Sequence, residues 1–363
     1  MRLSTLSPLL AIAALAAPAL AADPLRDQAT TLFQPIPTAP PELPGNPATP
    51  AKVELGRMLY FEPRLSESHN ISCNSCHLVG LGGVDGRPNS IGHNWQRGGR
   101  NAPTVLNAVF NTAQFWDGRA ADLKEQAGGP IANPIEMGIT KEHAVEQLKG
   151  IPGYVDAFKA AFPGEADPIT YANLENAIAV FEATLITPNA PFDRWLEGDD
   201  AALSDPQKQG LAVFVEKGCA ACHNGINVGG GMYAPFGVVQ RPGWEFLPPG
   251  DRGRFQVTKT VEDDYVFKVP TLRNIALTAP YMHDGSIPTL RDVVQHYVRG
   301  GRLIESGPYA GDGRLNPLKS GLVRSFDATD EEIDAVVAFL ESLTDYAFIE
   351  NRELSDPFVT AAR

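Results

Sequence analysis

The chain has 363 residues, of which 43% are hydrophobic, and its formal net charge is −13 at pH 7. This length suffices for one large hydrophobic core or two ordinary ones, and we expect two domains. The acidic balance leaves no basic face for nucleic acid, and after the N-terminus no segment is long and apolar enough to span a membrane.

The first 21 residues have the pattern of a cleaved secretory signal. Arg2 provides the positive start, residues 9–17 form a short apolar run, and residues 19–21 form the small-residue triplet Ala-Leu-Ala. The run is too short to cross a hydrocarbon core of about 30 Å. The alternative, a buried amphipathic helix, is disfavoured because no charged residue interrupts the run. We therefore expect an exported protein whose signal peptide covers residues 1–21.

Residues 22–50 follow as a proline-rich arm, because the run LFQPIPTAPPELPGNPATP favours an extended chain. Two passages with the same order of features come next. Each has a segment of helical periodicity, a CxxCH motif and a closing amphipathic helix. These are PAKVELGRMLYF, CNSCH and TYANLENAIAVFEATL in the first passage, and PQKQGLAVFVEKG, CAACH and TDEEIDAVVAFLESL in the second. The parallel order indicates an ancient duplication.

The two closing helices carry matching apolar stripes at helical spacing. The stripes consist of Leu174, Ile178, Phe181 and Leu185 in one helix, and of Ile333, Val336, Leu340 and Leu343 in the other. Thr329 and Glu332 have the spacing of a capping box, which predicts where the last helix begins. Proline and aspartate cluster in TPNAPFDRWLEGDD, so we expect a first domain at 51–190, a second at 200–346 and a tail at 347–363.

All four cysteines belong to the two CxxCH motifs. In an exported protein they could form two disulfides, and a lone CxxC could also be a redox dithiol or half of a zinc site. Two CxxCH motifs without a spare cysteine favour covalent haem instead, in which the thiols add to the vinyl groups and the histidine binds the iron. The residues are Cys73, Cys76 and His77 for the first haem, and Cys219, Cys222 and His223 for the second.

Between these landmarks lie long loops rich in glycine and proline, such as GLGGVDGRPNSIGHNWQRGGRNAP and GINVGGGMYAPFGVVQRPGWEFLPPGDRGRF. Long irregular segments in a compact protein usually wrap something or move, and a prosthetic group is the natural candidate. Strand-like alternation occurs only in RFQVTKTVEDDYVFKV. The predicted fold is mainly α, with two cytochrome c-like haem domains, long Gly/Pro-rich loops and little β structure.

The chain also contains three longer runs, SIGHNWQRGGRNAPTVLNAVFNTAQFWDGRAADLKEQAGGPIANPIEM, GDRGRFQVTKT and TLRNIALTAPYMHDG. Together they closely resemble the bacterial di-haem cytochrome c peroxidases. The resemblance covers nearly the whole mature chain. It implies a periplasmic enzyme, often a homodimer, that reduces hydrogen peroxide to water with electrons from a small cytochrome or cupredoxin. In such an enzyme the N-terminal haem is peroxidatic, and the C-terminal haem receives and stores electrons.

The resemblance also assigns residues to the distal side of the first haem. His93 matches the family's distal histidine, which caps the iron in the oxidised enzyme and leaves when the other haem is reduced. Its flanking glycines lower the cost of such a movement. Glu136 matches the distal glutamate, which can take a proton from one peroxide oxygen and return it to the other. Gln126 matches the companion amide. The alternatives are a surface histidine and a glutamate on a surface turn.

Trp116 matches a tryptophan between the two haems, where an indole can pack between domains and assist electron transfer. Trp95, Trp195 and Trp244 are interpreted as ordinary core or interface residues. A calcium ion at the domain interface is implied by the resemblance alone, bound through an Asn side-chain oxygen and backbone carbonyls. The residues of that site are Asn101, Thr278 and Pro280.

The sequence departs from the peroxidases at the second haem. There the family usually places a methionine ligand fourteen residues beyond the histidine that matches His283, and this chain has Tyr297. The related di-haem maturase of methylamine dehydrogenase has an axial tyrosine at this place. His296 points to the other side of the predicted helix, and Met282, Met232 or no residue at all are the alternative ligands. The helix face with Tyr297 contains Leu290, Val293, Val294, Tyr297 and Val298.

A tyrosine ligand would change the chemistry, because a thioether raises the potential of a haem and a phenolate lowers it. The leading hypothesis is a peroxidase that draws electrons from a small redox protein. The second is a maturase-like enzyme that uses peroxide to oxidise side chains of a partner protein. The third is a plain two-haem electron carrier, against which Glu136 and Gln126 argue.

Overall fold

The structure is a computed structural model that describes residues 23–235, 251–304, 311–316, 318–351, 354 and 356–358. The predicted signal and Trp244 lie outside these residues. Within them, none of the helices is both long and apolar enough to cross a membrane. The α-helices are α1 (Pro24–Leu32), α2 (Pro50–Tyr60), α3 (Cys73–Cys76), α4 (Leu123–Ala132), α5 (Lys141–Lys149), α6 (Pro152–Ala161), α7 (Tyr171–Ala183), α8 (Pro191–Leu196), α9 (Asp205–Glu216), α10 (Phe255–Thr258), α11 (Leu290–Val298), α12 (Asp330–Glu341) and α13 (Tyr346–Ile349).

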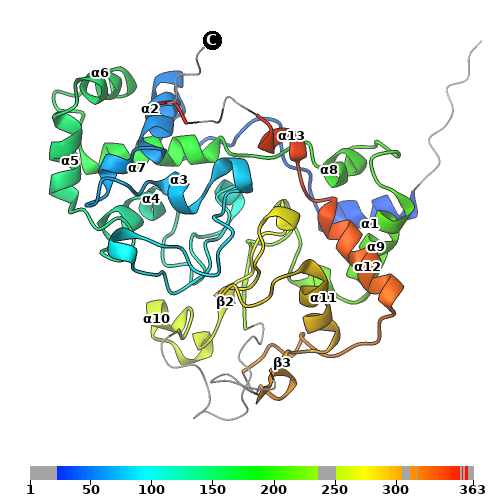
Figure 1. Cartoon of the computed structure of the whole chain (residues 1–363). Helices are drawn as coiled ribbons and strands as arrows, with labels where there is room; N and C mark the ends of the chain where they lie inside the picture. Colours follow the sequence, from blue (N-terminus) through cyan, green and yellow to red (C-terminus); the bar gives the residue numbers. More distant parts are fainter. Residues whose placement is uncertain are drawn as a thin grey trace, which may run out of the picture.

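The β structure of the described residues is limited to two short antiparallel pairs, as the sequence predicts. The strands are β1 (Tyr233–Ala234), β2 (Phe267–Lys268), β3 (Leu303–Ile304) and β4 (Gly311–Asp312). Strand β1 pairs with β2, and β3 pairs with β4. Figure 1 shows two helical bodies joined by long loops, with the β1–β2 pair among the loops between them. The mainly helical expectation is confirmed.

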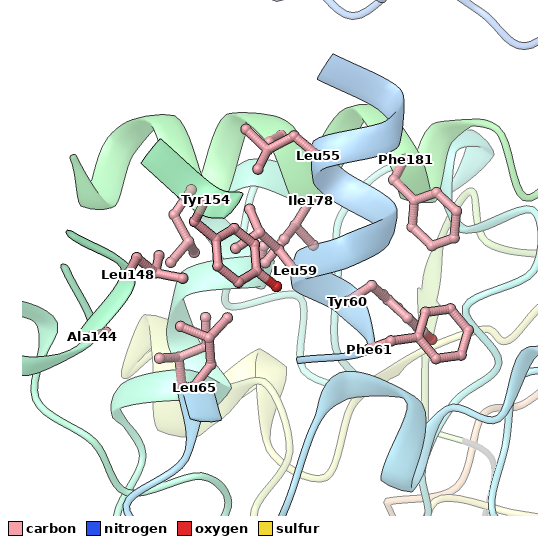
Figure 2. Packing of buried hydrophobic residues seen from close by; sticks show 14 of the residues in the cluster. Leu55, Leu59, Tyr60, Phe61, Leu65, Ala144, Leu148, Tyr154, Ile178 and Phe181 are labelled. Carbon is pink, nitrogen blue, oxygen red and sulfur yellow. The ribbon is translucent and has the colours of Figure 1, made fainter. Parts of the chain in front are cut away.

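Helices α2 and α7 form the centre of the first body (Figure 2). Helix α2 begins at Pro50 after Thr49, whose hydroxyl accepts a hydrogen bond from the Lys52 amide. The helices cross at Gly56, where a Cβ atom would clash with the carbonyl oxygen of Ala177. The predicted stripe of α7 is buried in this core, and its members are Leu174, Ile178, Phe181 and Leu185.

Helices α9 and α12 pack together in the second body in a similar way. A Cβ atom on Gly210 would clash with the carbonyl oxygen of Ala335, so a glycine again allows the close crossing. The predicted capping box is present, since the Thr329 amide donates to Glu332 and the Glu332 amide donates to the Thr329 hydroxyl. The predicted stripe of α12 is buried, and its members are Ile333, Val336, Leu340 and Leu343. Both bodies thus pair the helix before the CxxCH motif with the closing helix.

The arm begins with helix α1, which precedes the proline-rich run predicted to be extended. Asp23 caps α1 by accepting hydrogen bonds from the backbone of Leu25 and Arg26. Ala29 in α1 and Phe33 just after it are buried in the second hydrophobic core. The helix forms because it has both a cap and an apolar face to bury, which the proline content of the later arm obscured.

The chain also returns to the first body at its other end. Phe348 and Ile349 of α13, together with Leu354, pack against the first hydrophobic core. The start of the N-terminal arm therefore packs against the second body, where Figure 1 shows α1 beside α9 and α12, and the C-terminal tail packs against the first core. The exact domain limits, 51–190 and 200–346, stay predictions.

A fully buried ion pair joins the arm to the second body. The side chains of Arg273 and Asp193 are both 0% exposed, and their nearest N and O atoms are 2.8 Å apart. Arg273 also donates to the carbonyl oxygens of Gln34, at 2.9 Å, and Ile226, at 3.0 Å. Asp193 accepts a hydrogen bond from the Ile36 amide at 3.1 Å. Both ions therefore have hydrogen-bond partners besides each other, and these partners offset the free-energy cost of burying the two charges.

Candidate haem sites

The first CxxCH motif forms α3, a single helical turn. Ser75 accepts a hydrogen bond from the Ser72 amide, and the His77 amide donates to the Cys73 carbonyl at 3.0 Å. His77 Nδ1 lies 3.0 Å from the Pro103 carbonyl oxygen, which leaves Nε2 as the nitrogen that can bind a metal. Burial raises the pKa of Cys76 to about 11, as expected for a thiol enclosed for covalent attachment rather than held as a reactive thiolate.

The loop that carries His93 is held against the turn that carries Glu136. The His93 amide donates to the Glu136 carbonyl oxygen at 2.7 Å. Gly92 permits this approach, since a Cβ atom there would lie 2.6 Å from the same oxygen. Gly138 faces the imidazole ring, and its Cβ would lie 3.2 Å from His93 Cδ2. The structure therefore brings these two predicted residues together.

The loop continues through two residues in the left-handed region, Asn94 with φ 56° and Trp95 with φ 62°. Trp95 is 84% exposed, so its interpretation as a core or interface residue is wrong within this chain. The tight turn after His93 directs the chain, and with it this indole, to the surface. Trp195 follows the expectation and is fully buried in the second core.

Glu136 is a largely enclosed carboxyl whose surroundings differ from those of a surface turn. Its Oε2 atom is buried without a hydrogen-bond partner. Burial raises the pKa of Glu136, and the positive charge of Arg119 opposes the rise. The carboxyl is near the first motif, because its charge contributes to the raised pKa of Cys76. Gln126 lies partly buried in α4, the helix that leads into the Glu136 turn.

The second CxxCH motif opens on a cavity of about 230 Å³. Cys219, Cys222 and His223 line this cavity together with a mainly apolar wall. Burial lowers the pKa of His223 to about 4, so its imidazole is neutral at ordinary pH, as a metal ligand must be. Two thiols and a neutral imidazole at one wall of an apolar cavity fit the donor set for haem c.

Two of the proposed ligands for the second haem reach the same cavity. Tyr297 of α11 lines it, and the pKa of its hydroxyl is raised well above the usual value by burial and then by the charges of Cys219 and Cys222. Met282 also lines the cavity, whereas Met232 is not among its lining residues. His296, on the other side of α11, is itself buried and lies with its ring 5.1 Å from the Tyr297 ring.

Trp116 is buried and lines the cavity of the second motif. Its Nε1 donates to the Asn101 carbonyl oxygen at 2.9 Å, and its own carbonyl accepts from the Lys268 amide at 2.7 Å. Its ring is 6.4 Å from the His283 ring. The residues assigned to calcium, Asn101, Thr278 and Pro280, line the same cavity as Trp116.

Sequence reasoning missed three polar residues near these sites. Arg100 joins the two bodies by pairing with Asp117 and Asp251. Lys268 and Glu182 are ionisable residues that are buried, with 6% and 5% of their surface exposed. The sequence offers one indication that Lys268 and Glu182 are buried, since each stands within an apolar run, YVFKVP for the lysine and AVFEATL for the glutamate. Such a signal is weak, because half of a strand or helix faces solvent in most proteins.

Glu182 leads to a prediction about stability. It lies near Cys73, and burial raises its pKa from 4.5 to about 8, so the folded protein holds a proton that the unfolded chain releases. Stability should therefore fall as pH rises between these values, by up to about 1.4 kcal/mol per pH unit. Glu182→Gln should remove this slope in denaturant unfolding at several pH values. The exposed Glu146→Gln should keep it, and an unchanged slope in Glu182→Gln would contradict the burial argument.

Comparisons with known proteins agree with this geometry. Residues 50–201 match the family model described as di-haem cytochrome c peroxidase, and residues 207–344 match that of cytochrome c. The cytochrome c551 peroxidase of Pseudomonas aeruginosa is 56% identical over 279 residues, which are 77% of this chain and 81% of that protein. The chain belongs to the di-haem cytochrome c peroxidase family. Membership implies two covalently bound haem c groups, one at each motif.

Other members extend the comparison. The cytochrome c551 peroxidase of Nitrosomonas europaea is 48% identical over 291 residues, which are 80% of this chain and 79% of that protein. A crystal structure of a MauG-like protein associated with microbial copper homeostasis has 34% identity and a TM-score of 0.81. It covers 89% of this chain and 98% of its own. The predicted family and the fold of two cytochrome c domains are thus confirmed.

Proposed function

We propose that this chain is a periplasmic di-haem cytochrome c peroxidase. It reduces hydrogen peroxide to two water molecules, using two protons and two electrons from a small cytochrome c or cupredoxin. The observation that carries the proposal is Glu136, a buried carboxyl beside the first motif with one oxygen left without a partner. The identity to named peroxidases supports it, and the predicted signal at 1–21 supports export to the periplasm.

The residues around the first motif suit proton transfer. A haem held by Cys73, Cys76 and His77 would supply the iron and the electrons for peroxide reduction. Glu136 Oε2 takes the proton from one peroxide oxygen and returns it to the leaving oxygen, which departs as water. Gln126 is the companion amide. The His93 amide donates a hydrogen bond to the Glu136 carbonyl. A displacement of the His93 loop would therefore also move the Glu136 carboxyl.

The region between the motifs has two further assigned roles. Trp116 assists electron transfer between the two haem sites, and its hydrogen bond to Asn101 holds the indole in place. A calcium ion would bind Asn101 Oδ1 and the carbonyl oxygens of Thr278 and Pro280, completed by water. Support comes from the common cavity that all three residues line. A homodimer is the expected assembly, on the resemblance to the family.

The test of the function is a peroxidase assay on the purified protein with both haems attached. Hydrogen peroxide is added to a reduced small cytochrome c in the presence of the enzyme, and oxidation of the cytochrome is followed by its absorbance. We expect two cytochromes to be oxidised per peroxide consumed, at a rate proportional to enzyme. Failure of every small cytochrome and cupredoxin tried, together with peroxide-dependent oxidation of another protein's side chains, would overturn the proposal.

A second candidate function is the maturase-like oxidation of a partner protein's side chains. Two observations favour it: Tyr297 lines the second cavity, and a MauG-like protein is among the similar structures. A phenolate favours oxidised iron, so this ligand would suit storage of oxidising equivalents better than entry of electrons. The state of Tyr297 therefore separates the two candidates.

Tyr297→Phe is expected to change the absorption and EPR spectra of the second haem and to raise its midpoint potential, because a phenolate ligand is lost. The measurement is spectroscopy coupled to a redox titration of the intact protein. Tyr281→Phe is the matched control, since Tyr281 lines the same cavity but donates its hydroxyl to the Ile275 carbonyl at 3.1 Å. If spectra and potentials of Tyr297→Phe equal those of the wild type, Tyr297 is not a ligand.

A further inference from the structure

Lys268 is a buried cation without a counter-charge. It lies in β2, is 6% exposed, and lines the cavity of the second CxxCH motif. Among the described residues, no carboxylate, hydroxyl or carbonyl oxygen pairs with its ammonium group, and burial lowers the pKa of Lys268 to about 8. The backbone of Lys268 is held in place by two neighbouring segments. The Lys268 amide donates to the Trp116 carbonyl, and the residue is paired with Tyr233 of β1.

The other charged side chains around the cavity have partners. Lys217 pairs with Glu216 at 3.2 Å, and Arg324 donates to the Gly321 carbonyl at 2.6 Å. Glu332, the acid that lines the cavity, accepts the Thr329 amide in the capping box. The acids at the nearby interface, Asp117 and Asp251, are held by Arg100. Among the described charged residues of the cavity wall, Lys268 is thus the one whose charged group has no hydrogen-bond or ion-pair partner.

An ammonium group buried without an anion costs several kcal/mol, so a protein rarely keeps one unless the complete molecule supplies a partner. The cavity that faces Lys268 is the one into which Cys219 and Cys222 open. A haem attached there carries two propionate groups, and its thioether edge is fixed at the cysteines. Its carboxylates would supply an anion to Lys268, because the acid of the cavity wall, Glu332, already accepts the Thr329 amide.

We propose that Lys268 binds a propionate carboxylate of the haem attached at Cys219 and Cys222. The inference rests on the proposed two-haem function, which it deepens by naming a residue that holds the second haem and sets its charge environment. The ion pair joins that haem to β2, and through the Lys268 amide to Trp116 of the first domain. Lys268 is a cofactor-binding residue, and it also favours the reduced haem, because a nearby positive charge opposes oxidation of the iron.

The test uses the intact two-haem protein and the variants Lys268→Met, Lys268→Arg and Lys217→Met. In Lys268→Met we expect the midpoint potential of the second haem to fall by about 59 mV. This shift corresponds to a decrease of about tenfold in the ratio of reduced to oxidised haem at a fixed potential. Resonance Raman bands of the propionate should shift in the same variant. Lys268→Arg should retain both properties. Lys217→Met removes a charge from the same wall and should shift the potential much less, since Glu216 already neutralises that lysine.

Other results would overturn the assignment. An unchanged potential and unchanged propionate bands in Lys268→Met would mean that Lys268 has no haem carboxylate as its partner. A potential in the wild type that depends on added chloride or phosphate, with propionate bands insensitive to Lys268→Met, would assign the partner to a free anion. If Lys268→Met fails to fold, Lys268→Gln and the wild-type anion dependence decide. If the wild type has peroxidase activity, the proposed function stands whether or not Lys268 binds a propionate. If the wild type is inactive, the proposed function is overturned, but the assignment of Lys268 is not.

Discussion

Glu136→Gln is expected to lower peroxide turnover by about 100- to 10,000-fold, the usual contribution of a positioned acid–base group. The amide has the same shape as the carboxyl but cannot take a proton from one peroxide oxygen and give it to the other. The fold should be preserved, because the side chain contributes no ion pair among the described residues and its Oε2 has no hydrogen-bond partner. The measurement is the peroxidase assay with a reduced cytochrome c.

Two comparisons make this result specific. Glu142→Gln changes an exposed glutamate of α5 and should leave turnover unchanged. Absorption spectra of Glu136→Gln should show two attached haems, so that lost turnover is not lost cofactor. Full turnover in Glu136→Gln would remove this residue from the mechanism.

Arg273→Met is expected to destabilise the protein by about 3–5 kcal/mol, since it leaves the Asp193 carboxylate buried without its partner. The arginine also provides hydrogen bonds to Gln34 and Ile226, so the variant leaves carbonyl groups of the arm and of the loop after the second motif unpaired. The measurement is denaturant unfolding of the holoprotein, followed by far-ultraviolet circular dichroism.

Arg291→Met is the matched control for this prediction. Arg291 also pairs with two aspartates of the same body, Asp330 and Asp334, but these carboxylates are mostly exposed. An exposed pair contributes about 0–1 kcal/mol, so the control should unfold close to the wild type. The double variant Asp193→Asn with Arg273→Met should recover part of the loss, because no unpaired charge remains buried. Equal effects of Arg273→Met and Arg291→Met would contradict the burial argument.

Features that depend on short spacing were predictable from the sequence. A CxxCH motif places two thiols and an imidazole within one helical turn, and α3 shows that turn for Cys73–Cys76. The capping box of Thr329 and Glu332 and the two apolar stripes are likewise local patterns, and the structure confirms them. Tyr297 follows the same rule, since helical periodicity placed it on the face of α11 that lines the cavity.

Features that depend on contacts between distant segments were not predictable from spacing. Glu136 was assigned by resemblance, and its bond to the His93 loop exists because two glycines allow the backbones to meet. Helix α1 was not predicted, because it is stabilised by an apolar face that the second body covers. Trp95 shows the opposite error, because its exposure follows from the backbone of one turn and not from its hydrophobicity.

By itself, the sequence determined the attachment of two haem groups, the mainly helical fold and the family, because covalent motifs and helix periods are set by neighbours along the chain. Only the tertiary structure decided which charges are buried and what they face. Arg273 pairs with Asp193, which lies 80 positions away in the sequence, whereas Lys268 lines a cavity and has no ion-pair partner among the described residues. Burial is a property of the assembled surface, and the free energy of a charge depends on that surface far more than on its position in the chain.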